Sequence, residues 1–230
     1  MVACIFSVNS YASIFVGGGV GVTDGAILEA GYKMNPFISF RGRLGYLPSV
    51  NLKSMAGALE TNTRTPFASI DKLEMKSQSF DIGAEITPLP FVPIIRGIRL
   101  IGALQYLNTD FDIVSNVSGG TTIGNTTYAK SGNVHAQVSN KQTFAPYIGI
   151  GWDIINIPFI SLRLTGGATF RSFEVSQLYV TGDLVGAVSQ ADLNQEKAEL
   201  SKEIDKNIVI PSITLTARFN MINIPFIPIL

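Results

Sequence analysis

Apolar and polar residues alternate with a period of two along most of this chain, and that alternation limits the folds open to it. A period of two is typical of β-strands whose two faces meet different surroundings. The lengths of the alternating segments suit the roughly 9–11 residues of a tilted membrane-spanning strand. The segments number eight, at residues 13–22, 25–33, 38–47, 79–87, 96–107, 144–153, 160–171 and 208–219.

Composition excludes several other classes of protein. The 230 residues carry 17 basic and 17 acidic side chains, so no basic surface for nucleic acid is expected. One His and one Cys cannot supply an internal disulfide or a typical zinc site. The sequence also lacks the run of roughly 18 apolar residues that a transmembrane helix needs. We therefore predict no metal, no cofactor and no catalytic residues, and expect strands to provide any membrane crossing.

Charged residues and glycines share one face of the predicted strands. In 38–47, for example, Arg41 and Arg43 alternate with Phe40 and Leu44. Glycines weaken a solvent-facing sheet, but small residues beside long charged ones suit the crowded interior of an eight-stranded barrel. The pattern therefore predicts an antiparallel up-and-down transmembrane β-barrel with an apolar exterior and a polar interior. A soluble lipocalin-like binder would require the opposite assignment of the two faces.

The charges on the predicted inner face are expected to form ion pairs, because a buried unpaired charge is strongly unfavourable. Such a network would plug the barrel and leave little free lumen. The predicted members of the network are Glu29, Arg41, Arg43, Asp81, Glu85, Arg99, Arg163 and Arg218.

Short and long connections alternate along the chain. The short ones, Met34–Phe37, Pro88–Ile94 and Ile154–Phe159, each contain a Pro-Phe pair, whereas the long polar ones cover 48–78, 108–142 and 172–206. This sorting matches the periplasmic turns and extracellular loops of an outer-membrane barrel. Aromatic residues near the strand ends are predicted to form two girdles at the membrane interfaces; they are Tyr32, Phe37, Tyr46, Tyr106, Phe144, Trp152, Phe159, Phe170 and Phe219.

The last long connection contains a predicted helix at Ser189–Lys206. Ser189 can cap its first turn, which contains Asp192, and Leu193, Leu200 and Ile204 fall on one apolar stripe. The helix is expected either to pack over the barrel mouth or to present a surface to a partner.

The two ends of the sequence are read separately from the barrel, which is assigned to residues 13–219. Residues 1–12 resemble a signal-peptide remnant that is cleaved after Ala12. The positively charged region that begins such signals is missing, so either the true start lies upstream or this segment is a buried first strand. Residues 220–230 are predicted to form an apolar C-terminal tail. Within it, residues 222–227 nearly repeat 155–160, which is also compatible with another turn into a truncated strand.

The last 80 or so residues carry a family resemblance. Its features are Gly151-Trp152-Asp153, the strand through Gly167–Phe170, the helical segment from Ala191-Asp192 to Ile204-Asp205, and Pro211 before a strand that closes on Arg218-Phe219. This combination resembles a widespread proteobacterial family of small outer-membrane β-barrels, similar in architecture to OmpA and OmpX and mostly without an assigned function. Members usually end on the terminal Phe of the last strand, which the insertion machinery reads, whereas here residues 220–230 follow it.

The sequence thus predicts a non-enzymatic barrel of the bacterial outer membrane whose long extracellular loops serve adhesion, surface interaction or envelope integrity. Its expected surroundings are outer-membrane lipid, the barrel-insertion machinery and an extracellular partner, and the chain is expected to be a monomer. The alternatives are a porin-like conduit for a small solute or apolar ligand, a lipid-A-modifying enzyme that uses His135, and the soluble binder. Gly17–Gly21 resembles a phosphate-binding loop only superficially, because no helix follows it.

Overall fold

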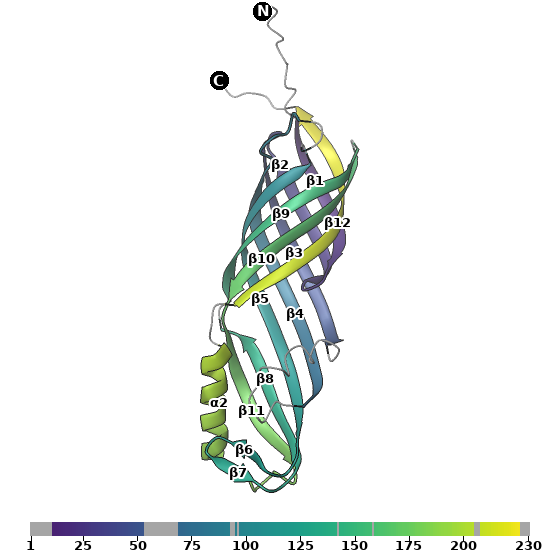
Figure 1. Ribbon diagram of the computed structural model, residues 1–230. Coiled ribbons are helices and arrows are strands. Elements are labelled where there is room, and N and C mark those ends of the chain that lie inside the picture. The colour runs from purple at the N-terminus through teal and green to yellow at the C-terminus, as the bar shows by residue number, and fades with distance from the viewer. Residues whose placement is uncertain are drawn as a thin grey trace, which may run out of the picture.

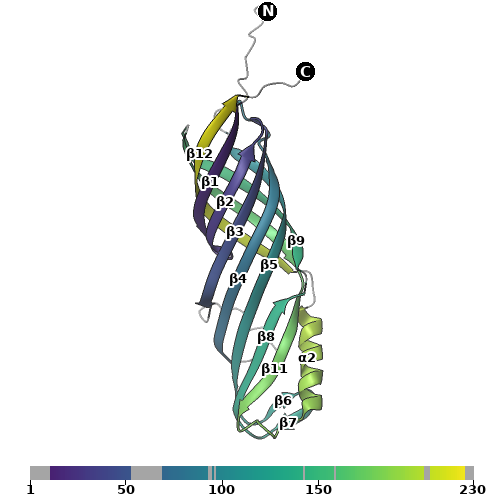
Figure 2. The same ribbon diagram turned by 180° about the vertical axis from the view of Figure 1, so that it is seen from behind.

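The structure is a computed structural model that describes residues 11–52, 69–92, 95, 97–141, 143–157, 159–204 and 208–225. Eight of the described strands form a barrel, each antiparallel to its neighbours (Figures 1 and 2). In order around the barrel they are β1 (Tyr11–Gly21), β2 (Gly25–Lys33), β3 (Ile38–Asn51), β4 (Ile70–Ile86), β5 (Ile98–Val117), β9 (Phe144–Asn156), β10 (Ile160–Arg171) and β12 (Ile208–Pro225). The predicted up-and-down barrel is therefore confirmed.

The first and last strands pair and close the barrel. The register of β1 with β12 runs from Tyr11 opposite Pro225 to Gly21 opposite Thr214. Residues 220–225 thus continue the last strand, which differs from the expectation that the barrel stops at residue 219 and a separate tail begins. Tyr11 and Ala12 likewise belong to β1, so the strands extend past the assigned 13–219 at both ends. Residues 1–10 and 226–230 lie outside the described part of the chain, and cleavage after Ala12 remains a prediction.

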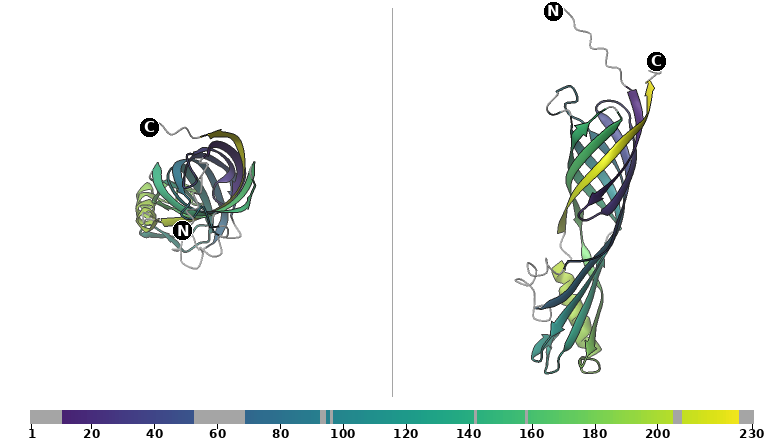
Figure 3. Two further views of the ribbon diagram at one scale, coloured as in Figure 1. Left: turned by 90° about the horizontal axis from the view of Figure 1, so that it is seen from above. Right: turned by 90° about the vertical axis from the view of Figure 1, so that its right-hand side faces the viewer.

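Beyond one end of the barrel, β4 and β5 continue into a second sheet (Figure 3). There β5 changes its partner from β9 to β8 (Gly132–Asn140), and β11 (Phe173–Gly182) completes the order β4-β5-β8-β11. The side chain of Asn140 bridges this change, since its Nδ2 donates to Leu107 O at 2.7 Å and its Oδ1 accepts from Thr109 N at 2.7 Å. The connections predicted as loops at 108–142 and 172–206 therefore contain strands.

One face of this second sheet carries an apolar core covered by α2 (Gln190–Ile204) and the hairpin of β6 (Thr121–Ile123) and β7 (Thr126–Tyr128). Leu193 of α2 is buried, and Leu200 and Ile204 pack against the same cluster, as their predicted stripe requires. Ser189 caps the helix by accepting a hydrogen bond from Asp192 N at 3.1 Å. The helix covers this second sheet at β11 (Figure 1). Because the sheet is built from the long connections, which the sequence assigns to the outside of the cell, it is called the extracellular sheet below. Among the described residues, no helix is both long and apolar enough to span a membrane.

The apolar face of β5 changes sides where the barrel ends. Within the barrel, Leu104 points outward and is 57% exposed, whereas Gln105 is buried inside. Beyond the rim, Ile113 and Val117 contribute to the apolar core on the covered face, and Asp112 lies on the open face. Lipid surrounds one half of the strand and water the other, so the favourable orientation of apolar residues reverses between them.

The barrel wall is apolar outside and polar inside. Phe40, Ile82 and Leu164 are 49%, 62% and 39% exposed on the outer surface, whereas Arg41, Glu85 and Arg163 are almost completely buried within. All nine aromatic residues assigned to the two girdles are exposed. A soluble barrel would turn these faces the other way, so this observation overturns the lipocalin-like alternative. The chain is a transmembrane β-barrel of the bacterial outer membrane.

Candidate functional site: the barrel interior and the extracellular face

Glu85 on β4 is the centre of the interior charge network. Its carboxylate has no exposed surface and accepts hydrogen bonds from guanidinium groups of two other strands. Arg163 Nη1 of β10 lies 2.7 Å from Glu85 Oε2, and Arg218 Nη2 of β12 lies 2.8 Å from Oε1. Ser39 Oγ of β3 donates to the same carboxylate at 3.2 Å. Four strands are therefore tied together at one buried acid.

Arg218 extends this network to β2 and β1. Its Nη2 donates to Glu29 Oε2 at 2.9 Å, and its Nε donates to the other oxygen of the same carboxylate. The guanidinium carbon lies 4.4 Å from the ring centroid of Phe15, a cation–π contact. The planar guanidinium can bind two carboxylates at once and stack on a ring, which a lysine ammonium cannot do equally well.

A second cluster forms around Asp81 on β4. Arg43 Nε donates to Asp81 Oδ2 at 2.5 Å, and Arg41 Nε lies 3.6 Å from Oδ1. Both guanidinium groups lie over the ring of Tyr147 of β9, at 5.9 Å for Arg41 and 5.5 Å for Arg43. Arg41 also approaches Glu85, with 3.6 Å between Nη1 and Oε1, so the two clusters are continuous.

Asp153 on β9 holds the part of the network nearest the short turns. Its Oδ1 accepts from Arg163 Nε at 2.6 Å, and its Oδ2 accepts from Arg99 Nη2 at 2.9 Å. Arg99 Nη1 donates further to Thr87 Oγ1 at 3.0 Å. Arg163 therefore bridges Asp153 and Glu85, and the ion pairs continue along the interior.

Toward the extracellular rim, the interior contacts are mainly hydrogen bonds, beside one longer ion pair of 3.9 Å between Arg43 Nη2 and Asp24 Oδ2. Arg171 of β10 donates to Gln105 Oε1 at 3.1 Å and to Thr109 Oγ1 at 3.4 Å. Gln105 Nε2 donates in turn to Asp24 Oδ1 at 3.4 Å. Asp24 reaches this position from the β1–β2 turn, where Gly25 adopts a φ of 66°. The cavity lined by these residues measures about 10 Å³, enough for about one water molecule.

Glycines on the inner wall make room for the large interior side chains. A Cβ on Gly167 would lie 2.2 Å from Tyr147 Oη, and a Cβ on Gly31 would lie 2.3 Å from Cζ of the Phe15 ring. Each ring therefore occupies the space above a neighbouring glycine. This is the close packing of small beside large residues that an eight-stranded barrel needs in order to fill its interior.

All eight residues assigned to the network from the sequence lie in the barrel interior, and each has a charged partner there. The sequence reasoning missed Asp24, Tyr147, Asp153 and Arg171 as members. Tyr147, Asp153 and Arg171 stand on the charged side of the strand alternation, so parity alone could have included them. Asp24 lies in a turn, where no alternation exists to assign its direction.

His135, the residue invoked for lipid-A modification, lies on the open face of the extracellular sheet. Its ring stacks on Tyr179 with centroids 4.7 Å apart and planes 6° apart, and its Nε2 is 3.1 Å from Thr181 Oγ1. Its partner on β5 is Val114, beyond the point at which β5 leaves the barrel. The histidine therefore stands away from the membrane edge, where an enzyme acting on lipid A needs its catalytic group.

The open face of the extracellular sheet is polar and continuous across four strands. One row of directly paired residues runs Glu74, Asp112, Gln137 and Gln177, and the next runs Lys72, Val114, His135 and Tyr179. A groove of about 230 Å³ crosses this face between Glu74, Asp112, Gln137 and Ser176.

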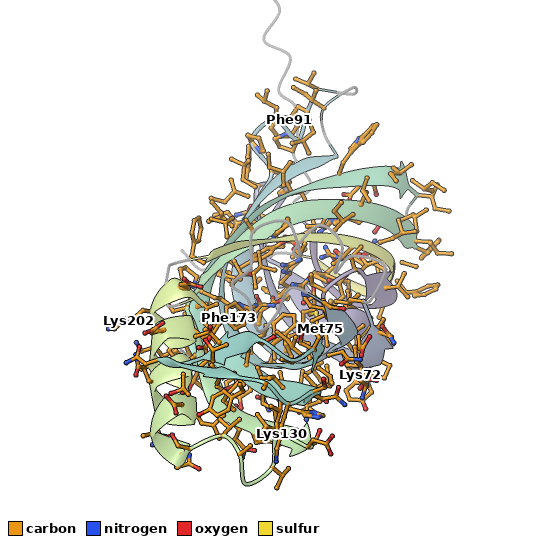
Figure 4. All side chains as sticks on the ribbon, turned by 60° about the horizontal axis from the view of Figure 1, so that its bottom comes forward. Lys72, Met75, Phe91, Lys130, Phe173 and Lys202 are labelled. Carbon is orange, nitrogen blue, oxygen red and sulfur yellow. The ribbon has the colours of Figure 1, made fainter. Side chains whose placement is uncertain are left out.

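Lys72 Nζ lies 3.0 Å from Glu74 Oε1 and, with Ser49, lowers the pKa of that carboxyl below its ordinary value. Figure 4 shows Lys72 and Lys130 at this end of the molecule, far from Phe91.

Comparison with known proteins supports the fold alone. No protein-family model matches the chain, and no curated protein is similar to it. Among solved structures, CarO of Acinetobacter baumannii is 17% identical with a TM-score of 0.54, covering 93% of this chain and 98% of that one. CarO2 of Acinetobacter baumannii is 16% identical with a TM-score of 0.61, covering 92% and 99%. The chain shares the overall fold of these outer-membrane β-barrels over nearly its whole length.

Proposed function

We propose that this protein is a non-enzymatic barrel that holds a folded extracellular domain on the cell surface for contact with molecules outside the cell. The observation that carries the proposal is that β4 and β5 pass without interruption from the barrel into a sheet with its own apolar core. The continuous strands fix the orientation of the sheet, so its polar face is presented at a set angle above the membrane.

The interior network supports a structural rather than a conducting role for the barrel. Ion pairs join Glu29, Asp81, Glu85 and Asp153 to arginines from other strands, and the side chains that form them cross the interior. A solute would have to break several buried pairs, each of which leaves an uncompensated charge at high cost. Such a barrel acts as a rigid anchor for the domain that it carries.

The contact face is assigned to the open side of the extracellular sheet, because α2 and the β6–β7 hairpin occupy the other side. The groove between Glu74, Asp112 and Gln137 and the neighbouring Tyr179 ring offer hydrogen-bonding groups beside an exposed aromatic surface. Aromatic side chains such as Tyr179 are enriched at binding surfaces, and a few placed polar groups beside them can fix the orientation of a partner.

The test compares adhesion of Gram-negative host cells that display the intact chain with cells that display D112A/Q137A/Y179A. The probes are immobilised purified lipopolysaccharide, a glycan array and an array of matrix proteins. A matched control, N194A/K202A, alters exposed residues of α2 on the opposite side of the domain. We expect the face variant to lose binding to at least one probe that the intact chain and the control both retain. Equal binding of all three proteins on every probe would contradict the proposal.

Planar-bilayer recording tests the conduit alternative separately. The plugged interior predicts no single-channel current from the purified intact protein at any applied voltage. Steady openings in the intact protein would favour a conduit for small solutes, whatever the outcome of the adhesion test.

A further inference from the structure

The short turns that join the barrel strands at the periplasmic end carry large exposed apolar side chains. Phe91 is 61% exposed and Phe159 is 68% exposed, and Phe37 packs edge to face on Phe91 with ring centroids 5.4 Å apart. Figure 4 shows Phe91 at the end of the molecule opposite Lys130. The described residues of these turns, at 34–37, 87–92, 95, 97, 157 and 159, include no charged side chain. This surface is continuous with the lipid-facing wall through Ile38, Ile86 and Ile160.

The backbone donors of the β2–β3 turn are also satisfied without water. Met34 N and Asn35 N both donate to Ile38 O, at 3.0 and 3.3 Å. The side chain of Asn35 accepts from Phe37 N and from Ile38 N, both at 2.8 Å, and Pro36 has no N–H to satisfy. Every backbone donor from residue 34 to 38 is therefore paired or absent. Water makes such complete pairing unnecessary in an ordinary surface turn, whereas hydrocarbon requires it.

Further backbone hydrogen bonds link the neighbouring turns in their described parts. Thr87 N donates to Phe37 O at 2.7 Å, which joins two of the turns directly. Ile157 N donates to Ile160 O at 3.0 Å, and Asn220 N of β12 donates to Phe159 O at 3.0 Å. Pro88 and Pro90 remove two further donors from the β4–β5 turn.

The height of the apolar wall indicates where the membrane boundary falls. On β3 the outward apolar side chains run from Ile38 to Tyr46. These eight residue steps span about 26 Å along the strand at about 3.3 Å per residue. A strand tilted by about 40° converts this length to about 20 Å of membrane depth, against the roughly 25 Å of a usual apolar band. The turn residues Phe37, Phe91 and Phe159 supply the missing height.

We propose that the periplasmic turns of this barrel are immersed in the inner leaflet of the outer membrane, with phospholipid as the partner of the Phe37–Phe91–Phe159 surface. The turns then act as an apolar anchor that fixes the depth of the barrel. The extracellular rim, where β5 reverses its apolar face, is thereby held at the opposite membrane boundary.

Tryptophan fluorescence in lipid vesicles tests this placement. The single tryptophan, Trp152, is replaced by phenylalanine, and one tryptophan is introduced by F37W, F91W or F159W in separate variants. Each protein is reconstituted into phosphatidylcholine vesicles with or without bromine atoms on the acyl chains, and aqueous iodide is added in a parallel titration. Y179W in the same background is the control in water, and the unaltered protein with its lipid-facing Trp152 is the control in lipid.

We expect the three turn variants to lose most of their emission in brominated vesicles, to emit at shorter wavelength than Y179W, and to resist iodide as Trp152 does. If all three emit like Y179W and are quenched by iodide but not by brominated lipid, the turns stand in water. That result would overturn the proposal and leave a periplasmic protein as the partner of this surface. A variant that does not show the heat-modifiable migration of a folded barrel is replaced by L89W, at another exposed apolar residue of the β4–β5 turn.

Discussion

Arg218 on the last strand and Glu85 on the fourth are joined across the barrel interior, with 2.8 Å between Nη2 and Oε1. Both side chains are almost completely buried, and 133 residues separate them in sequence. A contact of this kind forms only when the barrel has closed. The pair therefore links the closure of the sheet, seen at the β1–β12 seam, to the electrostatics of its interior.

Loss of the central carboxylate should destabilise the barrel. The substitution E85Q keeps the shape of the side chain but leaves the guanidinium groups of Arg163 and Arg218 buried without this counter-charge. We expect the free energy of unfolding to fall by about 3–5 kcal/mol. Urea unfolding in lipid vesicles, followed by tryptophan fluorescence and gel migration, measures the change.

The matched control for that prediction is E74Q, on the open face of the extracellular sheet. Glu74 also pairs with a cation, Lys72, but water surrounds the pair and screens it. We expect E74Q to unfold at nearly the same urea concentration as the unaltered protein. Equal losses for E85Q and E74Q would show that burial does not govern the strength of these pairs.

Two adjacent glycines on β10 should respond oppositely to an added methyl group. In G167A the new Cβ would lie 2.2 Å from Tyr147 Oη and 2.7 Å from Ile148 O inside the barrel, whereas at Gly166 no atom lies within 4 Å. We expect G167A to lose about 1–3 kcal/mol of stability through overpacking. G166A should change the free energy of unfolding by less than about 1 kcal/mol. We expect that change to be an increase, because alanine restricts the conformations of the unfolded chain. Parallel urea titrations compare the two, and an equal effect at both positions would contradict the assigned inward and outward faces.

The attachment of α2 to the β6–β7 hairpin should weaken in acid. Asp192 accepts hydrogen bonds from Ser189 Oγ at 2.6 Å, Tyr128 Oη at 2.7 Å and Asn125 N at 3.3 Å. These bonds, with that from Ser189 the largest influence, hold the pKa of the Asp192 carboxyl below its ordinary value. A carboxyl whose pKa is lower in the folded state than in the unfolded state stabilises the fold. That stabilisation is present at pH values above the unfolded-state pKa of about 3.9, and it is lost as the pH falls through the folded-state pKa.

Hydrogen exchange measures this loosening at the Asn125 amide. Its protection, corrected for the intrinsic exchange rate at each pH, should fall on acidification below the ordinary aspartate range. In D192N, where no carboxyl group titrates, protection should already be low and should show no acid step. A step of the same size in both proteins would assign the acid response to another group.

Much of the barrel could be predicted from the sequence because its two faces differ so strongly. The segments 25–33 and 160–171 have the predicted bounds, since a turn residue or a change of polarity stops each alternation at its true end. Residues such as Arg41 and Phe40 fall on opposite sides of a wall that separates lipid from a closed polar interior, so their parity alone determines their direction.

The extracellular domain was not predicted because its alternation has the reverse phase. On β4 the outward residues are apolar at Phe80 and Ile82 but polar at Glu74 and Lys76, so an alternation with apolar residues outward ends at residue 79. The strand continues while its surroundings change from lipid to water. A test for period two in either phase would have extended β4 and β5, but the pairing of β8 with β11 is a long-range contact that no local pattern specifies.

The central claim is that apolar residues face lipid along the barrel and face a covered core beyond its rim. Spin labels placed singly along β5 at Leu104, Tyr106, Asp112 and Asn116, and at Ala103 and Ile113, test it in vesicles through collision with oxygen or with a water-soluble nickel chelate. We predict high oxygen access at Leu104 and Tyr106, high nickel access at Asp112 and Asn116, and low access to both reagents at Ala103 and Ile113. Nickel access at Leu104 and Tyr106 equal to that at Asp112 would contradict the account.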